Sequence, residues 1–181
     1  MKKMKFRNEF ACLIFLCVLP GFAQLPQNPV ISDFGEIYNI PEATVLPEPD
    51  RDYKIVVDVY SGSPVSSVVA PSLNNVARMI NLHAIGGVPP EKIDVVLAIH
   101  GQATFALLNH ERFNDRFESD NPNAKLIEAL DEAGVKITLC GQSMIGRGIK
   151  KEDLLPEVQV ATSMLTTVST YQLKGYAVFK F

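Results

Sequence analysis

The residue best suited to chemistry in this sequence is Cys140, which follows a predicted strand and precedes Gly141-Gln142-Ser143. Backbone N–H groups exposed by such a turn, or by the start of a helix, stabilise a thiolate and lower the pKa of the thiol. Arg147 and Lys150 lie close in sequence and would add positive charge. We therefore consider Cys140 as a reactive thiolate. The alternative is a small buried hydrophobic residue, the commonest role of a free cysteine.

A second candidate is His100, which ends another predicted strand and precedes Gly101. If the two strands are neighbours, His100 would lie about 5 Å from Cys140 and could act as its base. The alternative is that His100-Gly101 only closes a tight turn. His83 is expected to be packed and His110 solvated, so the histidines and Cys140 lack the spacing of metal ligands. We expect no metal site and no cofactor.

Composition and motifs exclude several classes of protein. The chain has 181 residues, 17 Lys and Arg against 20 Asp and Glu, and 47% hydrophobic residues, which argues against global disorder. It has no basic cluster, so nucleic acid is not an expected partner. Residues 141–148 match the glycines of a phosphate-binding loop but lack its Lys-Ser/Thr. The predicted site therefore rests on position in the fold rather than on a motif.

The elements that would position these residues alternate between strand and helix. Near-continuous apolar runs predict buried parallel strands, and amphipathic segments between them predict helices. One helix is expected from a cap at Ser72 to Gly86-Gly87, a second from a cap at Asn121-Pro122 to Gly134, and a third from Thr162 or Ser163 to Gly175. The expected strands are residues 53–60, 93–99, 135–139, 158–161 and 176–181.

This alternation predicts a single α/β domain of flavodoxin-like type, with about five mainly parallel strands and helices on both faces. In an open parallel sheet, the ligand site lies beyond the carboxyl ends of the strands, where both His100 and Cys140 fall. The Ser-rich segment 61–71 is expected to be a loop. Residues 104–108 are expected to begin a short helix, and the polar residues 109–120 to form a long exposed connection.

The N-terminal residues carry two further expectations. Residues 1–23 combine a basic start, a short apolar run and small residues before Gln24, the pattern of a cleavable signal peptide. A membrane anchor is the alternative, but the apolar run is too short to span a bilayer. Cleavage would leave 13 basic and 19 acidic residues, a formal charge of −6, with Cys140 as the only cysteine. Residues 24–52 contain five prolines and are expected to form an extended strap on the domain, or else a disordered spacer.

Taken together, several stretches of residues 30–181 resemble the DsrE/DsrF-like family, which has the YchN-like fold, in its exported branch. The stretches are 34–38, 73–78, 99–101, 121–123, 139–143, 148–156 and 171–176. The resemblance implies a parallel α/β sheet, homo-oligomers such as trimers or hexamers, and relatives that carry sulfur as a cysteine persulfide. Cys140 matches the Cys of this branch's Cys-Gly motif.

Two functions follow as hypotheses. In the first, the protein is a periplasmic or otherwise exported sulfur carrier, with Cys140 as persulfide-forming nucleophile or thiol acceptor and a donor or acceptor protein, or a small thiol, as partner. His100 would orient or deprotonate the thiol. Gly101, Gly141, Gln142, Ser143 and Arg147 would line the ligand site. In the second, the protein is a non-catalytic oligomeric binding module with an inert Cys140. A weaker third possibility is a pocket for a small organic ligand at the same strand ends.

Overall fold

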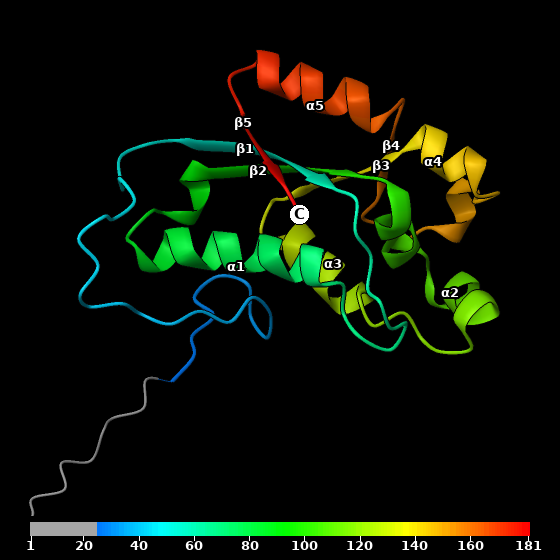
Figure 1. The fold of residues 1–181 in the computed structure, drawn as a ribbon, viewed down its shortest axis with the longest axis horizontal. Helices are drawn as coiled ribbons and strands as arrows, with labels where there is room; N and C mark the ends of the chain where they lie inside the picture. The colour runs from blue at the N-terminus through cyan, green and yellow to red at the C-terminus, as the bar shows by residue number, and fades with distance from the viewer. Residues whose placement is uncertain (1–24) are drawn as a thin grey trace, which may run out of the picture.

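The computed structural model describes residues 25–181, which form one α/β domain around a single sheet (Figure 1). All five strands pair in parallel, in the order β4-β3-β2-β1-β5. The strands are β1 (Tyr53–Val59), β2 (Ile93–Ile99), β3 (Lys136–Cys140), β4 (Gln159–Ala161) and β5 (Ala177–Lys180). The predicted fold class is confirmed. In the flavodoxin order the first strand lies between the second and third, whereas here β1 lies between β2 and β5.

The strand order explains why helices cover both faces of the sheet. From β1 to β4 the chain crosses the sheet in one direction, and α1 (Pro71–Ile85) and α3 (Ala124–Glu132) lie on one face. The chain then returns from β4 to β5 in the opposite direction. Because these crossovers are right-handed, reversing direction places the connecting helix on the other face. That helix is α5 (Met164–Leu173), which packs over β1, β2 and β5.

The main core lies between the sheet and the α1–α3 layer. Side chains of a strand alternate between the two faces, and the odd-numbered positions of the central strands, such as Val57, Leu97 and Leu139, belong to this core. They pack with the apolar residues of α1 and α3, including Leu73 and Leu126. Asp58, His100 and Cys140 are at even-numbered positions. They are therefore on the opposite face, which α5 covers.

The connections at the carboxyl edge of the sheet are more helical than the sequence indicates. After β2 the chain forms the 3-10 helix η2 (Gly101–Leu107) and then α2 (His110–Phe117). After β3 it forms α4 (Gly141–Gly146) and the short η3 (Lys151–Asp153). A further 3-10 turn, η1 (Pro90–Lys92), precedes β2 at the other edge.

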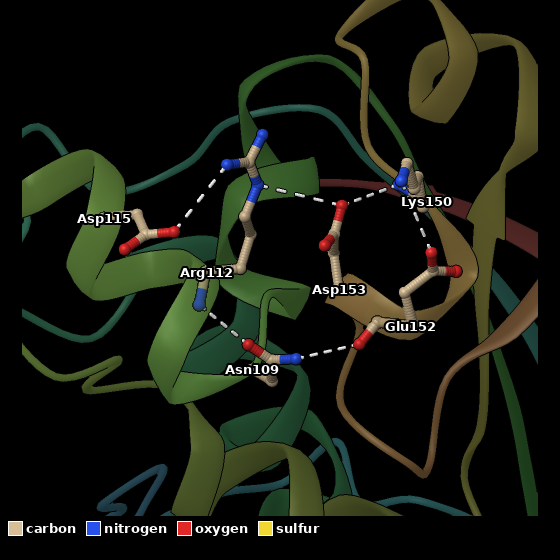
Figure 2. A network of polar contacts seen from close by, with 6 residues as sticks. All are labelled: Asn109, Arg112, Asp115, Lys150, Glu152 and Asp153. Atoms are coloured by element: carbon tan, nitrogen blue, oxygen red, sulfur yellow. Dashed lines mark hydrogen bonds and ion pairs between the residues drawn. The ribbon is translucent and has the colours of Figure 1, made fainter.

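Residues 109–120 are mostly exposed, as expected, but they contain the helix α2 instead of only a connection, because tertiary contacts stabilise it. Asn109 caps the helix by accepting a hydrogen bond from Arg112 N at 2.8 Å, and its Nδ2 donates to Glu152 O at 2.9 Å (Figure 2). Arg112 Nε lies 3.7 Å from Asp153 Oδ2. Phe113 is buried in the core. The helix thus depends on η3, a segment some 40 residues further along the chain.

Two helix starts also differ from the expected caps. The first helix begins at Pro71, and Ser72 instead donates its hydroxyl to Ser61 O in the preceding loop. The second begins at Ala124, one residue after Asn123. Asn121 Oδ1 accepts from Asn123 N at 2.9 Å and so stabilises the turn before the helix rather than the helix itself.

The Pro-rich segment 25–52 runs along the α1 side of the domain (Figure 1). It contains no helix or named strand, and Gln27 and Ile37 form an isolated bridge within it. Ile31 and Ile37 are buried. The fully buried Asn81 of α1 accepts from Ile31 N at 2.9 Å and donates to Phe34 O at 3.0 Å. This amide therefore satisfies backbone groups that the segment buries.

The expected signal peptide, residues 1–23, lies outside the residues that the structure describes. Within residues 25–181, none of the helices has the length and apolar character needed to cross a bilayer.

Candidate functional site

The thiol of Cys140 lies where β3 meets the first turns of two helices. Cys140 is the last residue of β3 and the N-cap of α4. It pairs with Ala161 of β4, which brings it next to Ser163, the N-cap of α5. Its Sγ lies 3.8 Å from Ser163 Oγ, to which the thiol donates. The side chain is buried, with 4% of its surface exposed.

Hydrogen-bond donors around Cys140 outweigh the effect of its burial. Burial alone raises the pKa of a thiol because it disfavours the charged form. Here the N–H of Met164 and the N–H of Ser143, with the hydroxyls of Ser143 and Ser163, hold the pKa of Cys140 below its ordinary value. These four groups can all donate to a thiolate. The site therefore favours the nucleophilic form of the sulfur.

Gly141 allows the end of β3 to approach β4 closely. A Cβ at this position would lie 2.8 Å from Ala161 O, closer than carbon and oxygen approach in real structures. Its role is therefore steric. The glycine keeps β3, β4 and the start of α5 near enough for Met164 and Ser163 to reach the thiol.

His100 lies beside the strand that carries Cys140 but bonds in another direction. Ile99 and Leu139 form the last pair between β2 and β3, and His100 and Cys140 are the residues that follow them. His100 Nε2 lies 2.7 Å from Asp58 Oδ1, and its ring packs edge-on against Tyr60 with 5.3 Å between centroids. Among the described residues, no hydrogen bond joins His100 to Cys140.

The remaining residues expected at the site do not all lie at the thiol. Gln142 is exposed, with Nε2 3.5 Å from Thr162 O, and stays near Cys140. Gly101 has φ +59 and lies against the ring of Tyr60, which leaves no room for a Cβ. The guanidinium of Arg147 lies 5.7 Å from the ring centroid of Phe105, and its Nη1 donates to Ser143 O at 3.4 Å.

Lys150, which the sequence placed near the thiol, bonds elsewhere. Its N donates to Asp153 Oδ2 at 2.8 Å, and its Nζ lies 3.6 Å from Glu152 Oε1 (Figure 2). The positive charge expected from Lys150 therefore does not help to ionise Cys140. Neutral hydrogen-bond donors do so instead.

The fold agrees with comparisons to known proteins. The model of the DsrE/DsrF-like family matches residues 54–181. The chain belongs to the DsrE/DsrF-like family. The ychN protein from E. coli has a similar structure, with a TM-score of 0.51, 26% identity, and coverage of 71% of this chain and 99% of that one.

A protein of unknown function, MTH1491 from Methanobacterium thermoautotrophicum, also has this fold. Its TM-score is 0.55 at 20% identity, and the match covers 72% of this chain and 100% of that one. No curated protein matches the chain. The match to the DsrE/DsrF-like family thus indicates a fold of the sulfur-relay type, and the chemistry of this member has to be argued from its own site.

Three residues that matter to the site of this DsrE-like chain were missed from the sequence. The sequence predicts Ser163 only as a helix cap, and the N–H of Met164 has no signature in a sequence. Both reach Cys140 only through the pairing of β3 with β4. Asp58 had a signal, since it is the single acidic residue inside the apolar strand 53–59.

Proposed function

We propose that this protein carries sulfur as a persulfide on Cys140. The observation that supports the proposal is the set of donors around Sγ, contributed by Ser143 of α4 and by Ser163 and Met164 at the start of α5. A thiolate at the carboxyl edge of a parallel sheet is a nucleophile at the place where such folds hold their ligands. Membership of the DsrE/DsrF-like family supports the same chemistry.

The proposed step is a transfer of sulfane sulfur. The Cys140 thiolate attacks the outer sulfur of a donor persulfide, R–S–SH. A new S–S bond forms on Cys140 while the S–S bond of the donor breaks, and the donor leaves as the thiolate R–S⁻. The step involves no net oxidation. The outer sulfur of the new persulfide then occupies the place where Ser143 and Ser163 donate hydrogen bonds.

His100 is the base in this proposal. A thiol that has not ionised must lose its proton before it attacks, and His100 follows β2, the strand that pairs with the strand of Cys140. Asp58 accepts from Nε2 and so fixes the ring and the tautomer. Nδ1 then carries the lone pair that accepts a proton.

The compartment and the partners are part of the same proposal. The signal-peptide pattern of residues 1–23 supports export to the periplasm or otherwise out of the cytoplasm. There the donor and the acceptor would be another persulfide-forming protein or a small thiol. We further propose that the chain assembles as a homo-oligomer, a trimer or a hexamer, and light scattering that gives the mass of a monomer would contradict this.

The test is the intact mass of the protein isolated from its own cells under rapid thiol trapping. We expect a fraction of the protein to carry one additional sulfur, which a reductant removes and which the Cys140→Ser variant lacks. A thiol that stays unmodified in cells, and also after incubation with a small-molecule persulfide, would contradict the proposal.

One observation favours the second hypothesis, a binding module with an inert thiol. Cys140 is 4% exposed, so a reagent has little direct access to Sγ. Alkylation of the folded protein separates the two functions. If Cys140 is inert, iodoacetamide reacts only at the rate of global unfolding. If it carries sulfur, reaction is faster than unfolding and follows the ionisation of the thiol.

A further inference from the structure

A separate pocket of about 700 Å³ lies at the carboxyl ends of β1 and β2. Its walls are the Ser-rich loop after β1, the helix η2 and the helix α2, which lie at the same end of the sheet as α4 (Figure 1). Cys140 and His100 do not line it. Its volume is within the range of pockets that bind small organic molecules.

The floor of this pocket is aromatic. The rings of Phe105 and Phe117 pack edge to face with 5.8 Å between centroids, and the ring centroids of Phe113 and Phe117 are 4.6 Å apart. Tyr60 lines the same pocket. Such a surface favours a flat apolar body, because aromatic rings gain both from burial and from stacked or edge-on contacts.

The pocket also contains one cation, Arg116, whose charge is unpaired among the described residues. Its guanidinium lies 4.2 Å from the ring centroid of Phe105 and 5.5 Å from that of Phe117. No Asp or Glu of residues 25–181 lies within ion-pair distance of it. The guanidinium of Arg147 lies 5.7 Å from the centroid of the same Phe105 ring. Arg147 also has no Asp or Glu of residues 25–181 within ion-pair distance.

Arg112, on the same helix, is paired with acidic residues, unlike Arg116. Its guanidinium lies between two carboxylates, 3.7 Å from Asp153 Oδ2 and 3.9 Å from Asp115 Oδ2 (Figure 2). The acidic residues of this acidic chain thus neutralise Arg112 and leave Arg116 and Arg147 unpaired beside an apolar surface. A guanidinium in that position pairs with a carboxylate through two parallel hydrogen bonds.

We propose that this pocket binds a small organic anion with a flat apolar body, of the class of the aromatic carboxylates. The apolar body lies on Phe105, Phe113 and Phe117, and the carboxylate pairs with Arg116. Ser61, Ser63 and Gln102, which also line the pocket, supply further polar groups along its edge. Binding here is independent of the sulfur chemistry of Cys140.

The wall formed by the loop is preformed. A Cβ at Gly62 would lie 2.8 Å from Gln102 O, so the loop contacts η2 through its backbone at this position. The hydroxyl of Ser63 donates to Val65 O at 2.6 Å and fixes the turn that follows. A pocket whose walls are ordered before binding loses little conformational entropy when the ligand enters.

The test is isothermal titration calorimetry of the purified protein with 2-naphthoate and with its neutral analogue 2-naphthalenemethanol. We expect the carboxylate to bind at least tenfold more tightly than the alcohol. The variant Arg116→Gln should weaken naphthoate at least tenfold and leave the affinity for the alcohol nearly unchanged. Arg112→Gln is the matched control, since it removes the same charge from the same helix and should change the affinity for naphthoate less than threefold.

Three results would overturn the proposal. The first is the absence of naphthoate binding to a protein that circular dichroism shows to be folded. The second is equal affinity for the acid and the alcohol, or an equal loss in Arg112→Gln and Arg116→Gln. The third is loss of binding in Cys140→Ser, which would place the ligand at the thiol rather than in this pocket.

Discussion

Ser163 Oγ lies 3.8 Å from Cys140 Sγ and also accepts a hydrogen bond from Leu165 N at 3.2 Å. The residue that caps α5 is therefore also the residue that contacts the thiol. Because α5 returns the chain across the sheet to β5, its first turn is fixed against β4, next to the end of β3. The helix start thereby supplies the thiol with donors that its own strand lacks.

Replacing Ser163 with Ala should raise the pKa of Cys140 and also destabilise the fold. The substitution removes one donor to the thiolate and the cap of α5, and loss of such a cap costs about 1 kcal/mol. Ultraviolet absorbance of the thiolate as a function of pH, with Cys140→Ser subtracted as background, measures the first effect. Chemical denaturation measures the second.

The control for this prediction is Ser169→Ala, which removes a hydroxyl from the same helix. Ser169 Oγ donates only to Thr166 O at 3.3 Å and is exposed. The Ser169→Ala variant should therefore have a Cys140 titration and a stability close to those of the wild type. An unchanged thiol titration in Ser163→Ala would show that the hydroxyl does not act on Cys140.

The ionisation of Cys140 also predicts how stability depends on pH. The pKa of the folded thiol is lowered, whereas an unfolded cysteine titrates near about 8.5. The resulting stabilisation is fully present above the unfolded pKa and is lost as the pH falls through the folded pKa. The free energy of unfolding of the wild type, relative to that of Cys140→Ser, should therefore increase with pH and level off above pH of about 8.5. A difference that is flat or decreases with pH would contradict a lowered pKa.

Replacing Asp58 with Asn should slow persulfide formation only where the thiol is protonated. Asp58 holds the ring of His100 through Nε2, so its loss leaves the proposed base without its fixed tautomer. We expect the rate of sulfur transfer from a small persulfide to fall about tenfold below the thiol pKa, less than the loss of a general base itself. Above that pKa the rate should match the wild type, because the thiolate is already formed.

Lys180→Gln is the control for Asp58→Asn. Lys180 Nζ lies 3.9 Å from the other carboxylate oxygen of Asp58 and is largely exposed, so this contact contributes little. Its loss should leave the rate unchanged at both pH values. A loss of rate in Asp58→Asn that is equal at all pH values would indicate a structural role for Asp58 instead.

The central strands β1, β2 and β3 could be predicted from the sequence because burial on both faces makes them continuous apolar runs, whereas β4 and β5 are mostly exposed. The strand ends near His100 and Cys140 follow directly, since each of these residues is followed by a glycine. The helix α2 could not be predicted in this way. Only Phe113 and Phe117 are apolar within it, and its stability depends on Glu152 and Asp153, which are distant in sequence.

The same reasoning separates the parts of the site that could be predicted from those that could not. Cys140 and its flanking Gly141 are adjacent in the sequence, which therefore indicates them together. The donors from Ser163 and Met164 depend on which strand lies beside β3, and no local pattern carries that information. Lys150 is close to Cys140 in the sequence, but its ammonium group contacts Glu152 of η3 and not the thiol.

Gly141→Ala tests whether the close approach of β3 and β4 is what ionises the thiol. The added Cβ would lie 2.8 Å from Ala161 O and would push the end of β3 away from β4 and the start of α5. We expect a loss of about 1–3 kcal/mol in the free energy of unfolding, the usual cost of overpacking, together with a higher pKa of Cys140.

Gly146→Ala is the matched control, because it is the same substitution in the same helix with nothing within 4 Å of the new Cβ. It should stabilise the protein by about 0.5–1 kcal/mol, as Ala does in place of Gly within a helix, and leave the thiol titration unchanged. If both variants gave the same titration as the wild type, the donors would reach Cys140 without the close contact, and Gly141 would matter for folding alone.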